Sequence, residues 1–256
     1  MIYDFQTQSF NFRYMENTIC RDMLIENHCH SEFEMLAVLE GDIKVIIEGK
    51  SLNLTSLDAI ILPPLLYHTI SSNKKGSYRR ITVIFDISAI PKQLSEFIYE
   101  KETVNTAFSW HRFEEIADIC KTGNENYYAP LADSLMTEIF YSYTAKKTEV
   151  SHSAYNDTLE KVIKYIDEHL FEKILLEDIA KHTASSKSLI SHLFQSKMKI
   201  SVKQYIIKKK LAMFDLLIRK GISPTDASAK LGYEHYSDFY RIRKKHLNRN
   251  DIPAES

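Results

Sequence analysis

The sequence predicts an α+β protein with two domains: a small β-barrel that carries accessory helices, and an all-helical domain that holds two helix-turn-helix units. Short β-rich runs separated by turn residues fill the first third of the chain, and helical periodicity dominates the remainder. The two predicted domains also differ in charge. Of 33 Lys and Arg and 34 Asp and Glu, roughly 19 and roughly 12 lie from residue 158 onward, so the C-terminal part is basic and the rest is acidic.

The first domain is expected to cover residues 1–144, with its barrel at about 20–87 and its accessory helices at about 91–144. Turn-forming residues separate the strand-like runs, which are residues 35–39, 43–48, 59–62 and 80–85. In the accessory region apolar residues recur at intervals of three and four, as helices packed beside a barrel require. They are Phe113, Ile116, Ala117, Cys120, Leu131, Leu135, Ile139 and Tyr143. A polar segment without periodicity, 145–157, is the expected linker to the second domain, 158–256.

Four side chains that can bind a metal occur at regular offsets in the strand-rich region. His28 and His30 alternate along the chain, Glu34 follows, and His68 comes later. Two histidines separated by one residue on a strand point to the same side, so this spacing predicts that they enter one cavity. The pattern resembles both halves of the cupin signature. The resemblance implies a barrel in which three imidazoles and one carboxylate form a site for a divalent transition metal.

The cupin pattern is imperfect, because Leu57 and Leu65 stand where the signature has glycines. Three interpretations of the histidine and glutamate set are open: a metal site, the polar lining of a pocket for a small-molecule effector, or ordinary structural residues. Cys29 alternates away from the two flanking histidines, so we do not expect it to be a ligand.

The helical domain is expected to begin with a supporting helix over residues 159–169, for which Asp157 is the N-cap. A short helix starting at Leu176, a turn over 182–185 and a second helix capped by Ser186 then form a helix-turn-helix. The residues expected on the core side of the second helix are Leu189, Leu193 and Phe194, and those on the groove-facing side are Lys187, Ser188, Ser191 and His192.

A second unit of the same kind follows about fifty residues later. Ser223 is the expected N-cap of its first helix and Pro224 its first residue, Gly232 supplies the turn, and a further helix covers about 235–246. The residues expected to point outward around the buried Phe239 are Tyr236, Ser237, Asp238 and Arg241. One continuous helix over 202–220 separates the two units, a spacing that suits successive major grooves of a DNA duplex.

The order of these landmarks resembles the two-unit DNA-binding domain of the AraC/XylS transcription regulators. The matching residues are the run from Leu176 to Ala180, the run from Ser186 to Phe194, and Ser201, Tyr205, Lys210, Leu211, Leu217, Gly232, Tyr233, Phe239 and Arg241. Base contacts are implied for Ser188, Ser191 and His192 in the first unit, and for Tyr236, Ser237, Asp238 and Arg241 in the second. The resemblance also extends to the barrel, because such regulators often bind effectors in one.

Several residues depart from the AraC/XylS pattern. Lys199 replaces the usual glycine after the first recognition helix, and Val202 replaces a later proline. Asn248 replaces another glycine and still tolerates a left-handed C-cap. Arg243 stands where the family buries Phe, so we expect its charge to be paired or turned to solvent.

Composition narrows the remaining classes of function. No apolar run approaches the length that crosses a bilayer, and residues 1–6 do not look like a secretory signal, so we expect a cytoplasmic protein without a membrane partner. Three cysteines at unrelated spacings do not suggest a disulfide framework. Only six glycines are present, and neither a phosphate-binding loop nor a nucleophile elbow is found, so no catalytic residues are assigned.

The sequence therefore predicts a sequence-specific DNA-binding regulator and not an enzyme. Its expected partners are double-stranded DNA, a small-molecule effector, a second copy of the chain and, for an activator, RNA polymerase. No cofactor is expected other than a divalent metal in the barrel under the first interpretation above. Two alternatives are a metal-dependent cupin enzyme with an accessory helical domain, and a DNA-binding protein whose barrel serves only for dimerisation or protein contacts.

Overall fold

The computed structural model describes residues 1–17, 28–72, 78–99, 104–105, 110–145 and 157–250. The chain divides into two compact units, a sheet unit within residues 1–154 and a helical unit from Tyr155 onward, with Cys29–Ser31 grouped with the second. This confirms the predicted α+β, two-domain fold class. The predicted linker, 145–157, lies almost entirely outside the described residues.

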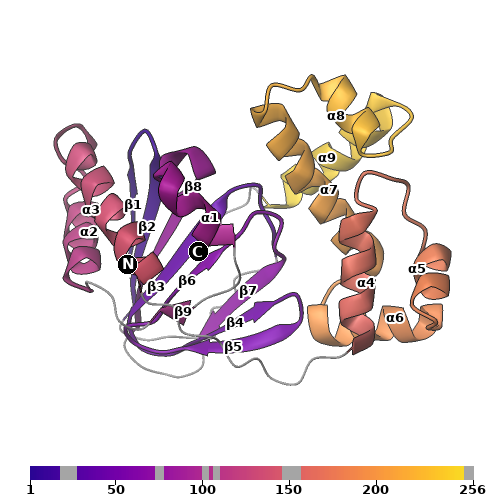
Figure 1. Ribbon diagram of the computed structural model, residues 1–256, viewed down its shortest axis with the longest axis horizontal. Helices are drawn as coiled ribbons and strands as arrows, with labels where there is room; N and C mark the ends of the chain where they lie inside the picture. The colour runs from indigo at the N-terminus through magenta and orange to yellow at the C-terminus, as the bar shows by residue number, and fades with distance from the viewer. Residues whose placement is uncertain (18–27, 73–77, 100–103, 106–109, 146–156, 251–256) are drawn as a thin grey trace. The chain divides into compact units, whose positions relative to one another are not determined.

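The larger sheet of the sheet unit has six antiparallel strands in the order β1-β2-β8-β3-β6-β9. Its strands are β1 (Ile2–Gln6), β2 (Phe10–Asn17), β3 (Phe33–Glu40), β6 (Ala59–Leu62), β8 (Tyr78–Phe85) and β9 (Val104–Asn105). The smaller sheet has the order β5-β4-β7, with β4 (Ile43–Ile47), β5 (Lys50–Leu54) and β7 (His68–Ser72). The four predicted runs correspond to β3, β4, β6 and β8 (Figure 1).

The described strands differ from the predicted barrel in two features. The described strands form two open sheets and not a closed barrel, because no ladder joins the edges of the two sheets beyond a single bridge between His28 and His68. The strand region also starts at Ile2 and not near residue 20, since β1 and β2 belong to the larger sheet. The alternation of Phe10, Phe12 and Tyr14, all buried on one side of β2, was the signal for this strand.

Apolar residues cover both faces of the larger sheet. One face packs on α1 (Lys92–Tyr99), α2 (Trp110–Thr122) and α3 (Glu125–Ala145), and α2 and α3 lie beside β1 and β2 in Figure 1. The other face contributes to a second apolar cluster with the smaller sheet, in which Leu36, Ile60 and Leu62 meet Val45 and Ile70. A short 3₁₀ turn, η1 (Ile87–Ala89), connects β8 to α1.

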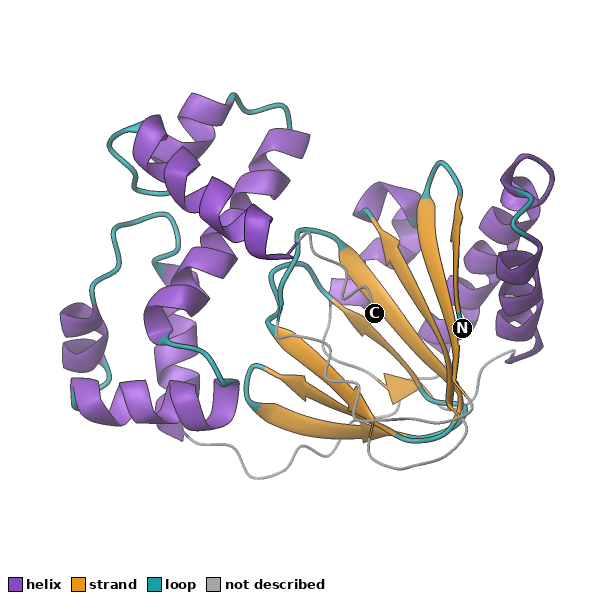
Figure 2. Cartoon of the chain, turned by 180° about the vertical axis from the view of Figure 1, so that it is seen from behind, coloured by secondary structure: helices purple, strands orange, loops and turns teal. Residues whose placement is uncertain are grey.

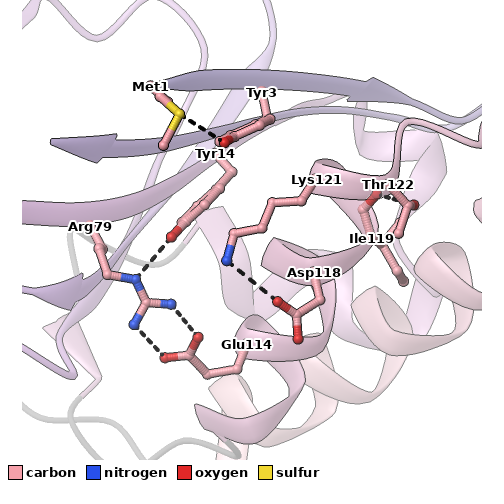
Figure 3. Close-up of polar contacts among 9 residues, drawn as sticks. All are labelled: Met1, Tyr3, Tyr14, Arg79, Glu114, Asp118, Ile119, Lys121 and Thr122. Atoms are coloured by element: carbon pink, nitrogen blue, oxygen red, sulfur yellow. Dashed lines mark hydrogen bonds and ion pairs between the residues drawn. The ribbon is translucent and has the colours of Figure 1, made fainter.

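The helix-facing side of β8 is fixed to α2 by a polar contact. Arg79 forms an ion pair with Glu114 of α2 through both terminal nitrogens, and its Nε donates a hydrogen bond of 2.9 Å to the Tyr14 hydroxyl (Figure 3). The hydrogen bond to Glu114 raises the pKa of Arg79 and keeps the guanidinium charged. Each nitrogen of this guanidinium therefore has an oxygen acceptor.

The apolar stripe predicted on α3 does not form a free surface. Leu135 and Ile139 are buried in the sheet unit's own core, whereas Leu131 is 47% exposed. The helix turns its stripe toward the sheet because that side removes most apolar area from water. The exposed apolar positions on this helix are Tyr127, Leu131 and Tyr141.

The helical unit contains two short helix pairs joined by one long helix (Figure 2). Its elements are α4 (Asp157–Glu168), α5 (Leu176–His182), α6 (Lys187–Leu193), the π-helix η2 (Phe194–Met198), α7 (Val202–Arg219), α8 (Pro224–Lys230) and α9 (Tyr236–Asn250). Leu159, Val162, Ile163 and Ile166 of α4 are buried, as their spacing predicts. No described helix has the length and apolar character needed to cross a bilayer.

Local capping sets the ends of these helices. The hydroxyls of Ser186, Ser201 and Ser223 each accept a hydrogen bond from a backbone N–H of the first turn that follows, and Ser201 forms a full capping box with Gln204. Lys199 adopts the left-handed conformation, with φ of 54°, at the end of η2. The family's usual glycine at this position is therefore explained by backbone conformation.

One core assignment in the first recognition helix is wrong. Leu189 is 44% exposed, whereas Ile190 is fully buried together with Leu193 and Phe194. Helical spacing places residues 190, 193 and 194 on one face, and Leu189 belongs to the neighbouring exposed face. The sequence places hydrophobic residues at both 189 and 190, so periodicity alone did not separate them.

Phe194→Ala is expected to reduce the free energy of unfolding by about 3 to 5 kcal/mol, because its fully buried ring packs edge-on against Tyr205 at 5.3 Å. Leu189→Ala removes an exposed side chain from α6, the helix that directly precedes Phe194, and should change that free energy by no more than about 0.5 kcal/mol. Urea denaturation followed by circular dichroism measures both values. Equal losses in the two variants would contradict this burial assignment.

Candidate functional site

The first candidate recognition helix, α6, presents several exposed polar side chains beside the exposed Leu189. Its predicted groove-facing residues are all exposed: Lys187, Ser188, Ser191 and His192. The side chain of Lys187 forms an ion pair with Glu177 of α5. This contact lowers the pKa of Glu177 and holds the two helices of the unit together at their exposed edge.

The second candidate recognition helix, α9, begins at Tyr236. Ser237 and Arg241 are exposed, whereas Tyr236 and Asp238 are half-buried, and Tyr236 packs partly against the core around Phe239. The Arg241 guanidinium forms an ion pair with Asp238 one turn earlier. Two of the predicted base-contacting side chains are therefore already ordered by each other on the helix surface.

Arg243 does not disrupt this second unit. Its guanidinium donates a hydrogen bond of 3.1 Å to Asp215 of α7 and lies 5.3 Å from the centre of the Phe214 ring. The charge of Arg243 is thus paired with a carboxylate and stacked on a ring at the edge of the core. This agrees with the expectation from the sequence that the charge would be paired or turned to solvent. The replacement of Phe by Arg is accommodated through a carboxylate on the neighbouring helix.

A buried lysine joins the two helix-turn-helix units. Lys210 of α7 is 5% exposed, and its Nζ donates hydrogen bonds to the backbone oxygens of Glu172, at 2.5 Å, and Leu231, at 2.6 Å. Glu172 lies between α4 and α5, and Leu231 follows α8. One side chain therefore connects a loop of the first unit to a turn of the second.

The backbone at this junction is closely packed. Gly232 has φ of 79°, and a Cβ at that position would lie 2.8 Å from the carbonyl carbon of Glu172. Only glycine fits both the conformation and the space. The turn between α8 and α9 therefore packs directly against the loop between α4 and α5. This contact limits how the two helix-turn-helix units can move relative to each other.

The second candidate site lies in the strand-rich part of the chain. One ligand atom from each of His28, His30, Glu34 and His68 lies within 4.8 Å of the others, so the predicted residues come together. His68 Nε2 and Glu34 Oε2 are 3.0 Å apart, and both side chains are buried. Burial alone would lower the pKa of His68, but the hydrogen bond and negative charge of Glu34 raise it above its usual value.

The donor set at this site fits a divalent transition ion. Three imidazoles and one carboxylate are ligands that Zn, Fe or Mn accept, and they are close enough to share one ion. The same residues also suit a polar pocket lining. Leu57 and Leu65, which replace glycines of the cupin signature, have φ of 74° and 66°, so they keep the left-handed backbone of that pattern.

A cavity of about 450 Å³ extends from this cluster over one face of the larger sheet. His28 and Glu34 line it together with Arg80 and Thr82 of β8. Neither Arg80 nor Thr82 was among the residues predicted from the sequence. Their signal was the alternation of Arg80, Thr82 and Ile84 against the buried apolar residues 81, 83 and 85, which places a charged residue on an inward-facing position.

Comparisons with known proteins indicate helix-turn-helix regulators. The chain is 23% identical over 153 residues to the uncharacterized HTH-type transcriptional regulator YdiP of Escherichia coli, covering 57% of this chain and 49% of that protein. It is 26% identical over 99 residues to the regulatory protein PocR of Salmonella typhimurium, covering 38% and 33%. The matched regions thus span half or less of these curated relatives. No protein-family model matches the chain.

Among solved structures, the chain overlaps with ToxT from Vibrio cholerae with a TM-score of 0.44 and 14% identity, over 93% of this chain and 94% of that one. This overlap is too loose to assign a function. The similarity to curated regulators agrees with the resemblance found in the sequence of the helical unit.

The buried Lys210 is expected to make the stability of the helical unit depend on pH. Burial lowers its pKa to about 8 from 10.5, so between pH 8 and pH 10.5 the unfolded chain binds more protons than the folded chain. The free energy of unfolding of the unmodified protein minus that of Lys210→Met should therefore increase with pH. The increase should be at most about 1.4 kcal/mol per pH unit. Denaturant titrations across this range measure it.

Lys203→Met is the matched control, because it removes an exposed lysine from the same helix. Its pH dependence should follow that of the unmodified protein. If the difference in free energy of unfolding between the unmodified protein and Lys210→Met stays constant from pH 8 to pH 10.5, burial does not lower the pKa of Lys210.

Proposed function

We propose that this chain, which is similar to helix-turn-helix transcription regulators, binds specific DNA sequences through α6 and α9 and responds to a small molecule held in the sheet unit. The observation that carries this proposal is that α6 and α9 both present exposed polar side chains and belong to two helix-turn-helix units that are joined through the buried Lys210. A pair of reading helices held in a constant relation is what two neighbouring major grooves require.

The dimensions and charge of the helical unit support DNA binding. The 18 residues of α7 span about 27 Å at 1.5 Å per residue, which is close to the roughly 34 Å turn of the duplex. The basic residues that dominate the sequence from residue 158 onward would contact phosphates and displace counterions, which supplies affinity that does not depend on sequence. The proposed base contacts are then added to this general affinity.

The cavity of the sheet unit supports the second part of the proposal. A volume of about 450 Å³ lies within the range of small-molecule sites, and its lining combines mostly polar and charged side chains with the apolar Phe5, Phe12, Ile70 and Ile84. A ligand that binds one conformation of the regulator better than another would change its occupancy of DNA. The cluster of His28, His30, Glu34 and His68 would then contribute polar contacts at one end of the cavity.

We further propose that the regulator works as a cytoplasmic homodimer and, where it activates, contacts RNA polymerase. The core positions of α3 are not available for self-association, so the proposed dimer surface is limited to the exposed Tyr127 and Leu131, one turn apart on that helix. Light scattering on the full chain at micromolar concentration tests the dimer. A strict monomer would contradict it.

A metal-dependent cupin enzyme is the second candidate function, and the four-residue cluster is the observation that favours it. When bound, a divalent ion would act as a Lewis acid on a substrate in the cavity. Metal analysis of the purified full chain separates the two functions. We expect DNA binding that survives chelation, whereas stoichiometric Fe, Mn or Zn with no preference for duplex DNA would favour the enzyme.

His192→Ala and Arg241→Ala are each expected to weaken binding to preferred DNA sites by about 1 to 3 kcal/mol and to change binding to random duplexes little, because a lost base contact removes discrimination. The preferred sites are first selected from a random duplex pool with the unmodified protein. Titrations at fixed salt then give both affinities.

Lys164→Ala is the control for charge, because this exposed lysine lies on α4, outside both recognition helices. It should leave the ratio of specific to random affinity unchanged. Equal losses on specific and random DNA for His192→Ala and Arg241→Ala would show that these side chains contact only the phosphate backbone.

A further inference from the structure

A second cavity lies inside the helical unit. Its volume is about 680 Å³, which is larger than that of the cavity in the sheet unit. The loop before α5 and the first turns of α7 form one wall, and the turn before α9 and α9 itself form the other. Figures 1 and 2 show the loop between α4 and α5 beside the part of the unit that carries α8 and α9. The cavity therefore lies between the two helix-turn-helix units.

The walls of this cavity are aliphatic and incompletely covered by the protein. Six leucine and isoleucine side chains line it, and each of them is half-buried or exposed. A molecule with an apolar body would remove these side chains from water on entering, which is favourable in proportion to the area covered. The volume lies in the range of small-molecule sites. The six side chains are Ile174, Leu175, Leu176, Ile206, Ile207 and Ile242.

The cavity has one buried hydrogen-bond donor, the ammonium group of Lys210. An ammonium has three N–H donors, and the backbone oxygens of Glu172 and Leu231 accept two of them. The Nζ atom also lies 5.3 Å from the centre of the Tyr233 ring, which is beyond hydrogen-bond distance. Because Lys210 lines the cavity and is 5% exposed, its third N–H can donate to an acceptor on a bound molecule.

The charges at the edge of the cavity favour a neutral molecule. Lys173 and Lys203 line it together with Glu234 and Asp238, so two positive side chains are balanced by two negative ones. A charged ligand would approach groups of its own sign as well as opposite ones. A carboxylate would also lose its hydration on entry, and the ammonium of Lys210 already donates to two carbonyl oxygens.

We propose that the cavity between the two helix-turn-helix units binds a neutral apolar small molecule that carries one hydrogen-bond acceptor. The acceptor receives the third N–H of Lys210, and the apolar body packs between the isoleucines of α7 and Ile242 of α9. This ligand site is separate from the effector cavity of the sheet unit, because its lining comes entirely from residues 173–242.

An occupant of this cavity would contact a segment that the proposed function uses to read DNA. Asp238 lines the cavity and forms the ion pair with Arg241, and Gly232 lies in the turn that holds α9 against the first helix-turn-helix unit. We expect the ligand to change the placement of α9 and to weaken binding to preferred DNA sites. This regulatory meaning rests on the proposed function, whereas the ligand site does not.

Three molecules that share two phenyl rings test the ligand class by equilibrium dialysis against the full chain. Benzophenone is neutral and has one carbonyl acceptor, diphenylmethane lacks the acceptor, and diphenylacetate carries a negative charge. Benzophenone should bind about fivefold or more tightly than diphenylmethane, because it accepts a hydrogen bond. Diphenylacetate should bind more weakly than benzophenone. The proposal is overturned if benzophenone does not bind, or if either comparison molecule binds equally well or better.

Photochemical labelling locates the bound molecule. Ultraviolet light makes benzophenone form a covalent bond at a neighbouring C–H group, and mass spectrometry of peptides identifies the labelled residue. We expect labels on the aliphatic walls, within residues 174–176, 206–207 or at Ile242. A label confined to any other part of the chain would show that the cavity is not the binding site.

Cavity-filling variants provide an independent test. Ile206→Trp and Ile242→Trp place a larger side chain into the cavity from α7 and α9 and should each weaken benzophenone binding about tenfold or more, because the ligand loses its space. Lys245→Trp adds the same side chain at an exposed position of α9 and should retain the affinity. Full affinity in both filling variants contradicts the proposal. Circular dichroism checks folding, and the label position in the unmodified protein decides if a variant does not fold.

Duplex binding by the same protein samples separates this inference from the proposed function. Benzophenone binding in the labelled cavity, by a protein that prefers no duplex sequence, supports the ligand site and removes the regulator assignment. Selective DNA binding without benzophenone binding overturns the ligand site alone. Selective DNA binding that saturating benzophenone leaves unchanged overturns the expected regulation by this site.

Discussion

The contact on which the helical unit depends is the pair of hydrogen bonds from Lys210 to two backbone oxygens. An ammonium group can satisfy carbonyls from different segments at once, and burial strengthens those bonds while it penalises the charge. Together with the close approach at Gly232, this interaction joins the two helix-turn-helix units. The relative placement of the reading helices therefore depends on a small polar junction and on the stiffness of α7.

Sequence patterns identified most elements of this unit, because its helix ends are determined locally. Ser186, Ser223 and Pro224 act within one turn of their own position, so their roles follow from residue type alone. The exposed position of Leu189 and the burial of Leu135 depend on which side of a helix meets the rest of the core. Adjacent apolar residues leave that choice open until tertiary contacts decide it.

The residues of the sheet-unit cavity likewise fall into those that the sequence predicted and those that depend on tertiary contacts. The spacing of His28, His30, Glu34 and His68 predicted their convergence, because alternation on strands carries across a whole sheet. Arg80 and Thr82 alternate with the buried apolar residues of β8, but they were not identified because tertiary contacts decide which face of that strand borders a cavity. The separation into two open sheets could not be derived from local periodicity, because it depends on pairing between distant segments.

Strand β8 is covered on both faces, and its pleat sends consecutive side chains to opposite faces. Arg79 is anchored to the helix layer through Glu114, and Arg80 lines the cavity on the reverse face. A single peptide unit thus separates the interior of the cavity from the outer shell of the sheet unit. Because neighbouring residues of this strand contact the two layers, a shift of its backbone would alter the contact with α2 and the lining of the cavity together.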